Sequence, residues 1–163
     1  MVERFNTLLK EVKDDLHGVI NYSSHIEDEI RLLNKANKRT LGKCRKWMGG
    51  TYEIYLNPML LEMSNQLIKD VIAHELIHTV EGCFDHGFEF KKQMGYVNLN
   101  CNNYTVEVRT TSNEWKEKRK YKYKLTCKKC GKVFYRNRLI HKYIKSGGYT
   151  HICGGDLEIE QLY

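Results

Sequence analysis

The sequence contains a single proline, Pro58, among 163 residues, and it has no long uninterrupted hydrophobic run. The scarcity of proline argues against long disordered linkers. No apolar segment is long enough to cross a bilayer, and the charged first ten residues lack the apolar core of a signal peptide. We therefore expect an intracellular, cytoplasmic protein that has no membrane partner.

The composition fits one domain of ordinary size, or one domain with a small appended module. A hydrophobic fraction of 41% is enough to form a core. In a reducing compartment the six cysteines are expected to be thiols or metal ligands rather than disulfides. Cys44, Cys83 and Cys101 show no metal-ligand spacing and are expected to be small core residues.

The most informative stretch, residues 71–78, reads Val-Ile-Ala-His-Glu-Leu-Ile-His. On a helix His74 and His78 leave the same face, so both imidazoles can reach one zinc ion at about 2.0–2.1 Å. Glu75 lies beside them, where it can act on a water molecule as a general base without binding the metal. The apolar residues around this motif predict a buried helix, in which the polar side chains need partners.

A third metal ligand is expected shortly after this helix. Gly82 is a helix-ending residue that lets the chain turn back and bring His86 to the metal. Asp85 and Glu89 are the competing ligands. Three protein ligands with an open fourth position are typical of catalytic zinc, which lowers the pKa of a bound water molecule to about 7.

Hydrophobic periodicity predicts the surrounding elements. Helices are expected over residues 2–19, 64–81 and 86–94, the last one ending at Gly95. Strands are expected over residues 40–48 and 51–56, with Gly49 and Gly50 forming the hairpin turn between them, and a β-like run covers residues 104–110. Residues 51–56 either form an edge strand that binds an extended substrate or serve a purely structural role.

The C-terminal part has the features of a zinc ribbon. A Cys-x-x-Cys-Gly knuckle follows a strand-like run, and a Cys-Gly-Gly segment lies near the end of the chain. Thr150 stands where a regular second knuckle would have its first cysteine. The expected ligands of a structural zinc are Cys127, Cys130, Cys153 and His151, with His141 as the alternative fourth ligand. Reduced thiols without a metal are the competing interpretation.

Positive charge is concentrated in the same part of the chain. Residues 116–145 contain thirteen Lys or Arg and one acidic residue, whereas the remainder is formally negative. Lysines neutralise phosphates and aromatic rings stack on unpaired bases, which favours single-stranded or distorted DNA as a partner. The candidate nucleic-acid contacts are Trp115, Lys120, Tyr121, Lys122, Tyr123, Lys128, Lys129 and Arg136. A solvated basic face with no partner is the alternative.

The order of these motifs resembles the SprT-like, or Spartan-like, family of zinc metalloproteases. The similarity rests on His-Glu-Leu-Ile-His, on His-Gly-Phe-Glu-Phe from residue 86, on the run from Glu53 to Pro58, and on the Cys-Gly-Gly segment. It implies an α+β fold, with a zincin-like metalloprotease domain over residues 1–115, built of helices on a small, mainly antiparallel sheet. A basic zinc-ribbon-like module then follows over residues 116–163.

The resemblance also implies a chemistry. His74, His78 and His86 would hold a catalytic zinc, Glu75 would be the general base, and the substrates would be DNA-bound or DNA-crosslinked proteins. Two other functions compete with this one. One is a non-catalytic zinc-ribbon protein linked to transcription or repair, which would not need Glu75. The other is a small-peptide peptidase, which would not need the basic segment.

Overall fold

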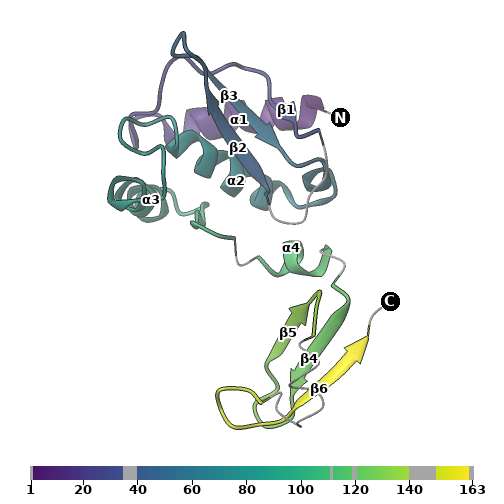
Figure 1. Cartoon of the computed structure of the whole chain (residues 1–163). Coiled ribbons are helices and arrows are strands. Elements are labelled where there is room, and N and C mark those ends of the chain that lie inside the picture. Colours follow the sequence, from purple (N-terminus) through teal and green to yellow (C-terminus); the bar gives the residue numbers. More distant parts are fainter. Residues whose placement is uncertain (1, 35–39, 111, 119–120, 140–149, 162–163) are drawn as a thin grey trace. The chain divides into compact units, whose positions relative to one another are not determined.

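The computed structural model describes residues 2–34, 40–110, 112–118, 121–139 and 150–161. The chain forms two compact units, Met1–Trp115 and Lys116–Tyr163, and each unit is described by itself (Figure 1). As the sequence predicts, the fold is α+β, with helices on a small sheet followed by a small β module.

The first unit contains most of the helices. Its elements are α1 (Val2–Leu16), β1 (Arg31–Leu32), β2 (Gly42–Lys46), β3 (Tyr52–Leu56), the 3-10 helix η1 (Pro58–Glu62), α2 (Asn65–Ile77) and α3 (Phe88–Asn100). Helix α4 (Asn113–Lys118) contains the boundary between the units. None of the helices in the described part of the chain is long and apolar enough to cross a membrane.

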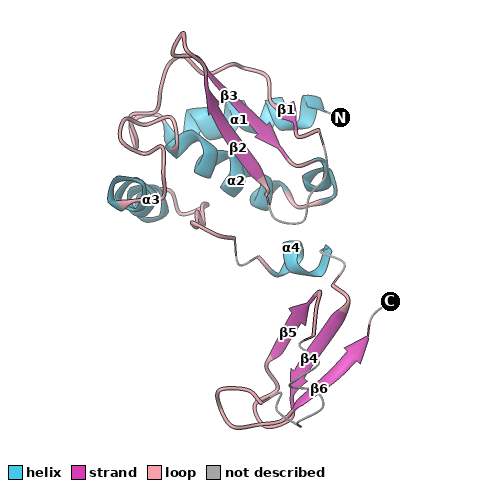
Figure 2. Ribbon diagram, viewed as in Figure 1, coloured by secondary structure: helices cyan, strands magenta, loops and turns pink. Residues whose placement is uncertain are grey.

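The core of the first unit lies between the sheet and two helices. Helix α1 buries one stripe, formed by Phe5, Leu8, Leu9, Val12 and Leu16. Each such side chain stabilises the fold by about 1.5–3 kcal/mol when it is fully buried. Helix α1 packs on α2, and both helices lie on the same face of the sheet (Figure 2). The metal-ligand helix is therefore central to the unit.

The sheet order is β1-β3-β2, with β1 parallel and β2 antiparallel to β3. The expectation that residues 51–56 form a substrate-binding edge strand is therefore wrong. Both edges of β3 are already paired, and strand addition requires a free edge. Within the described residues β2 pairs only with β3, so β2 is an edge strand of this sheet, as β1 is on the other side.

Several elements differ from the sequence prediction, beginning with α1, which ends at Leu16 rather than at residue 19. Helix α2 ends at Ile77, before Gly82, because the chain turns through residues 79–82. Helix α3 continues through Gly95 to Asn100, since the buried residues Phe90 and Val97 hold both sides of that glycine in the core. Residues 104–110 form no strand.

The second unit is a three-stranded antiparallel sheet. Its strands are β4 (Tyr123–Cys127), β5 (Val133–Arg136) and β6 (Leu157–Gln161), in the order β5-β4-β6. Leu125 lies opposite Phe134 on one side and Ile159 on the other. Strand β4 ends at Cys127, so the sheet delivers the first cysteine of the knuckle to a fixed position.

Candidate active site and metal centres

Helix α2 and the turn after it bring three histidines together. Ser64 caps the start of α2 by accepting a hydrogen bond from the Leu67 N–H at 3.3 Å. His74 and His78 lie one turn apart at the other end of the helix. Gly82 adopts a left-handed φ of 77°, which favours glycine, and the chain returns with His86. One nitrogen from each ring lies within 4.8 Å of the others.

Backbone carbonyls fix the rings of the two helical histidines. His74 Nδ1 lies 2.9 Å from the carbonyl oxygen of Glu107, and His78 Nδ1 lies 2.8 Å from that of Cys83. A carbonyl oxygen only accepts, so each Nδ1 carries the proton and each Nε2 keeps its lone pair. This is the outer-shell arrangement that orients metal-binding histidines.

The lone pairs point into a shared space. His86 Nε2 lies 3.0 Å from His74 Nε2. The His74 ring carries its proton on Nδ1, so its Nε2 offers a lone pair. Three nitrogen donors converging in this way fit a zinc ion with one open position. The three histidines would hold that ion, and the exposed side of His86 leaves the site open to solvent.

Phe90 of α3 supports all three imidazoles. Its ring centroid lies 4.9 Å from that of His74, 4.6 Å from that of His78 and 4.7 Å from that of His86. Phe90 is fully buried, so it cannot move aside without opening the core. Sequence reasoning assigned Phe90 no role at the metal site.

The surroundings keep the histidines neutral. Burial, followed by the neighbouring His78 charge, lowers the pKa of His74 to about 4. Burial also lowers the pKa values of His78 and His86, and the charge of Arg109 adds to the effect on His86. Neutral imidazole is the form that binds metals, so these groups are ready to coordinate at neutral pH.

Glu75 faces β2 and is 5% exposed. Burial raises the pKa of Glu75 to about 8, while the backbone N–H of Cys44 donates a hydrogen bond to the carboxylate. A Cβ atom at Gly42 would lie 2.5 Å from Glu75 Oε1 and 2.8 Å from its Cγ. Only glycine leaves room for this carboxylate, a role that sequence inspection did not assign to Gly42.

The other two candidate ligands have different partners. Asp85 accepts a hydrogen bond from the Gly87 N–H at 2.8 Å, and Glu89 lies 3.8 Å from the ammonium of Lys92. Neither carboxylate belongs to the group of converging ligand atoms found among the described residues. The structure thus assembles three imidazoles beside one buried carboxylate.

This arrangement agrees with the comparison to known proteins. Residues 5–112 match the SprT-like family. The chain belongs to the SprT-like family. No curated protein matches it. The match covers about two thirds of the chain and includes all three histidines and Glu75, and membership suggests metalloprotease chemistry for this SprT-like site.

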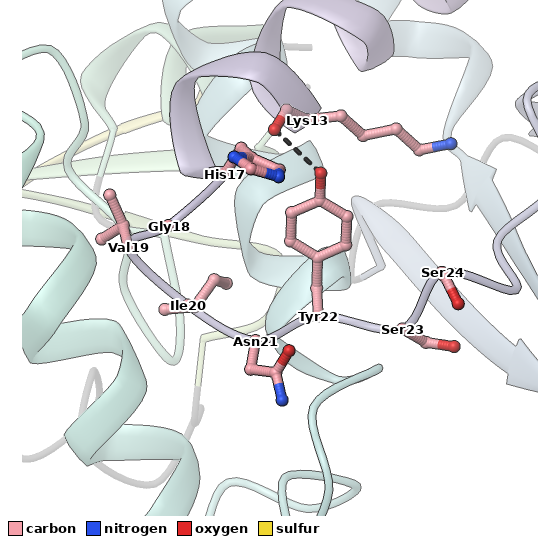
Figure 3. A pocket seen from close by; sticks show the side chains of 9 residues that line it. All are labelled: Lys13, His17, Gly18, Val19, Ile20, Asn21, Tyr22, Ser23 and Ser24. Atoms are coloured by element: carbon pink, nitrogen blue, oxygen red, sulfur yellow. Dashed lines mark hydrogen bonds between the residues drawn. The ribbon is translucent and has the colours of Figure 1, made fainter.

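The SprT-like unit also has a surface groove away from this site. This groove has a volume of about 700 Å³ and is lined by Lys13 and residues 17–24, whose side chains are drawn in Figure 3. The Tyr22 hydroxyl donates to the Lys13 carbonyl at 2.9 Å, and the Ser23 N–H donates to Thr79 Oγ1. None of the three histidines lines this groove, and we assign it no ligand.

A second group of converging ligands lies in the C-terminal unit. It consists of Cys127, Cys130, His151 and Cys153. The Sγ atoms of Cys127 and Cys153 are 3.5 Å apart, and His151 Nδ1 lies 3.2 Å from Cys130 Sγ and 3.0 Å from Cys153 Sγ. Three sulfurs and one imidazole nitrogen fit a closed tetrahedral zinc site. His141 lies outside the described residues.

Glycines shape both knuckles of this unit. Gly131 and Gly154 adopt left-handed φ values of 71° and 76°, one residue after Cys130 and Cys153. Backbone N–H groups of the first knuckle, chiefly that of Cys130, lower the pKa of Cys127 to about 7. Thr150 is exposed, and His151 replaces the missing ligand one position later.

The candidate nucleic-acid contacts have different environments. Trp115 is 1% exposed and belongs to the core of the first unit, so its predicted role in base stacking is wrong. Lys120 lies outside the described residues. The Tyr121 ring packs 5.3 Å from that of Tyr135.

The remaining predicted contacts lie at the surface or near it. The Lys122 ammonium lies over the half-buried Tyr123 ring, and Lys129 Nζ donates to the Cys153 carbonyl at 3.0 Å. Lys128 and Arg136 are exposed. Nucleic-acid binding by these residues stays a prediction.

Proposed function

We propose that this SprT-like protein is a zinc-dependent metalloendopeptidase that cleaves proteins bound or crosslinked to DNA. The observation that carries the catalytic part is the convergence of three neutral imidazoles beside the buried Glu75 carboxylate. A scaffold would have no use for a carboxylate in this position, since burying one without a function is costly.

The chain supplies the parts that hydrolysis needs. Zinc, when bound, supplies a Lewis acid for the scissile carbonyl and acidifies the attacking water. Glu75 takes a proton from that water and delivers it to the leaving amine nitrogen. The Cys44 N–H would hold the carboxylate in place during both transfers.

Strand β2 is the surface on which an extended substrate would lie. The backbone N–H of Trp47 donates to the carbonyl of Thr51, and the backbone N–H of Asn57 donates to the carbonyl of Leu41. These two bonds lie at the two ends of the β2–β3 ladder. Alternation along an antiparallel pair then turns the polar backbone groups of Gly42, Cys44 and Lys46 to the unpaired edge, where the Cys44 N–H already donates to Glu75. A peptide that adds to this edge passes beside Glu75.

The link to DNA comes from the C-terminal unit. Its basic residues supply phosphate contacts, and the proposed zinc of the Cys127 knuckle fixes the fold that carries them. Single-stranded DNA is the proposed partner because aromatic side chains lie among the lysines in residues 121–136. Proteins held on the same strand would then be presented to the first unit.

The test uses the full chain loaded with zinc. Cleavage of casein reports peptidase activity, and cleavage of a protein crosslinked to a single-stranded oligonucleotide reports the DNA link. We expect Glu75→Gln to retain zinc and lose cleavage of both substrates, whereas the exposed control Glu81→Gln keeps both activities. Cleavage by Glu75→Gln at the wild-type rate would disprove the catalytic assignment. Equal cleavage of free and crosslinked protein would disprove the DNA link alone.

A further inference from the structure

The sheet of the first unit has an outer face that the helices do not cover. Residues that lie opposite each other in neighbouring strands share a face, and successive residues alternate between faces. Cys44 and Ile54, which are opposite each other, belong to the face packed on the core. The outer face is formed by the alternate residues Arg31, Lys43, Arg45, Glu53 and Tyr55.

A buried carboxylate organises this face. Glu53 is 3% exposed, although its register opposite Arg45 places it on the outer face of the sheet. The Tyr55 hydroxyl donates to Glu53 Oε2 at 2.6 Å, and the Arg31 guanidinium lies 2.9 Å from Oε1. The Trp47 side chain donates a further hydrogen bond, and these donors lower the pKa of Glu53. The negative charge of Glu53 is thus paired by neighbouring side chains, and other side chains cover it from solvent.

The covering groups form a stacked pair of planar side chains. The Arg45 guanidinium carbon lies 3.8 Å from the centroid of the Trp47 ring, and Arg45 also bonds to Tyr55. Trp47 remains 42% exposed, and Met48 beside it at the hairpin tip is fully exposed. An exposed indole is held at a fixed orientation by its bonds to Glu53 and Arg45, so little entropy is lost when a planar ligand stacks on it.

Cations surround this platform. Lys43 and Arg45 lie exposed on the outer face, and the exposed Arg31 lies opposite Tyr55 on the same face. The Glu53 carboxylate is covered, so a ligand meets mainly the positive groups. A planar aromatic surface flanked by cations fits bases and phosphates of a single strand, and sheet faces are a common site for such contacts.

We propose that the outer face of the β1-β3-β2 sheet binds single-stranded nucleic acid. Bases stack on Trp47, and phosphates meet Lys43. This site belongs to the protease unit and is separate from the basic C-terminal unit. The proposal does not rest on peptide cleavage, and it holds for the inactive Glu75→Gln protein as well. Helices α1 and α2 cover the opposite face of the sheet (Figure 1).

The protein contains only two tryptophans, which makes the site directly observable. Trp115 is buried and Trp47 is exposed, so acrylamide quenches the fluorescence of Trp47 selectively. We expect a short oligothymidylate to protect Trp47 in the full chain from acrylamide. Trp47→Ala should weaken oligothymidylate binding about 5-fold or more, as the loss of one stacked base requires. Zinc content and circular dichroism verify that the variant is folded.

Charge variants give a second readout. Lys43→Gln should lower the slope of log affinity against log salt by about 0.7, the value for one phosphate contact on a single strand. The matched control is Lys10→Gln on α1, which should leave the slope unchanged. The comparison of the Lys43→Gln and Lys10→Gln salt slopes tests binding at the outer face even if Trp47→Ala proves unstable.

Three outcomes would overturn the proposal. Oligothymidylate could bind the chain through the C-terminal unit and leave Trp47 as accessible to acrylamide as before. Lys43→Gln and Lys10→Gln could have the same effect on the salt slope. Vesicles of phosphatidylserine and phosphatidylcholine could protect Trp47 where oligothymidylate does not, which would assign the face to a membrane surface.

Discussion

The backbone N–H of Cys44 donates a hydrogen bond to the carboxylate of Glu75, and this bond connects the edge strand β2 to the metal-ligand helix α2. The two residues are far apart in the sequence, and the contact forms only because Gly42 has no side chain. The proposed general base and the proposed substrate strand are therefore held together by one contact. This contact leads to the first prediction.

Gly42→Ala should reduce peptidase activity while zinc binding persists. The new methyl group would meet Glu75 at 2.5 Å and displace the carboxylate, and misplacement of a catalytic group can cost about 100-fold in rate. Gly49→Ala is the matched control, because a Cβ there meets nothing within 4 Å. The readouts are casein cleavage and bound zinc. Equal activity of the two variants would contradict this account of Gly42.

His86→Ala should weaken zinc binding by about 100-fold or more, since even outer-shell substitutions cost 10–100-fold. Asp85→Asn should bind zinc as the wild type does, because its amide oxygen still accepts the hydrogen bond from Gly87. Competition with a chromogenic chelator measures both affinities. A large loss of zinc affinity in Asp85→Asn would identify that carboxylate as a ligand.

The metal site could be predicted from the sequence more completely than the strand order of the sheet. The spacing of His74 and His78 is local, and helix geometry converts it directly into a shared face. The order of the strands depends on β1, a pairing of only two residues, Arg31 and Leu32, that no sequence pattern reveals. This short strand makes β3 central and leaves β2 at the edge.

Backbone partners were also invisible in the sequence. The carbonyl groups of Glu107 and Cys83 orient two histidines, and any residue type would supply the same oxygen. The continuation of helix α3 through Gly95 was likewise not predictable from the local sequence. A glycine costs about 1 kcal/mol in a helix, and burial of Phe90 and Val97 outweighs that cost.

Cys127→Ser with Cys130→Ser should reduce the zinc content of the full chain from two equivalents to one. The substitutions remove two of the four ligands in the C-terminal unit, whereas the histidine site lies wholly in the first unit. Elemental analysis of purified protein gives the count. An unchanged zinc content would show that this ribbon holds no metal, or that the knuckle is not its site.

Acid stability should depend on Glu53. Its pKa in the folded protein lies below the ordinary value of 4.5, so the ionised form stabilises the fold. This contribution is fully present above about pH 4.5 and is lost as the pH falls through the folded-state pKa. We expect Glu53→Gln to melt at a lower temperature than wild type at pH 7. In acid the difference between the two melting temperatures should become smaller.

Melting curves of both proteins between neutral and acidic pH provide this test. The comparison cancels the loss of zinc in acid, which affects both proteins alike. A gap between the two melting temperatures that stays constant down to the lowest pH would refute the role of Glu53.

The missing side chain at position 42 also affects how such sequences are read. A relative could keep every letter of His-Glu-x-x-His and still be inactive if a larger residue occupied the position of Gly42. Loss of activity in evolution would then leave no trace in the motif that is normally used to recognise these enzymes. Sorting active members from inactive ones requires inspection of an edge strand that precedes the motif by about thirty residues.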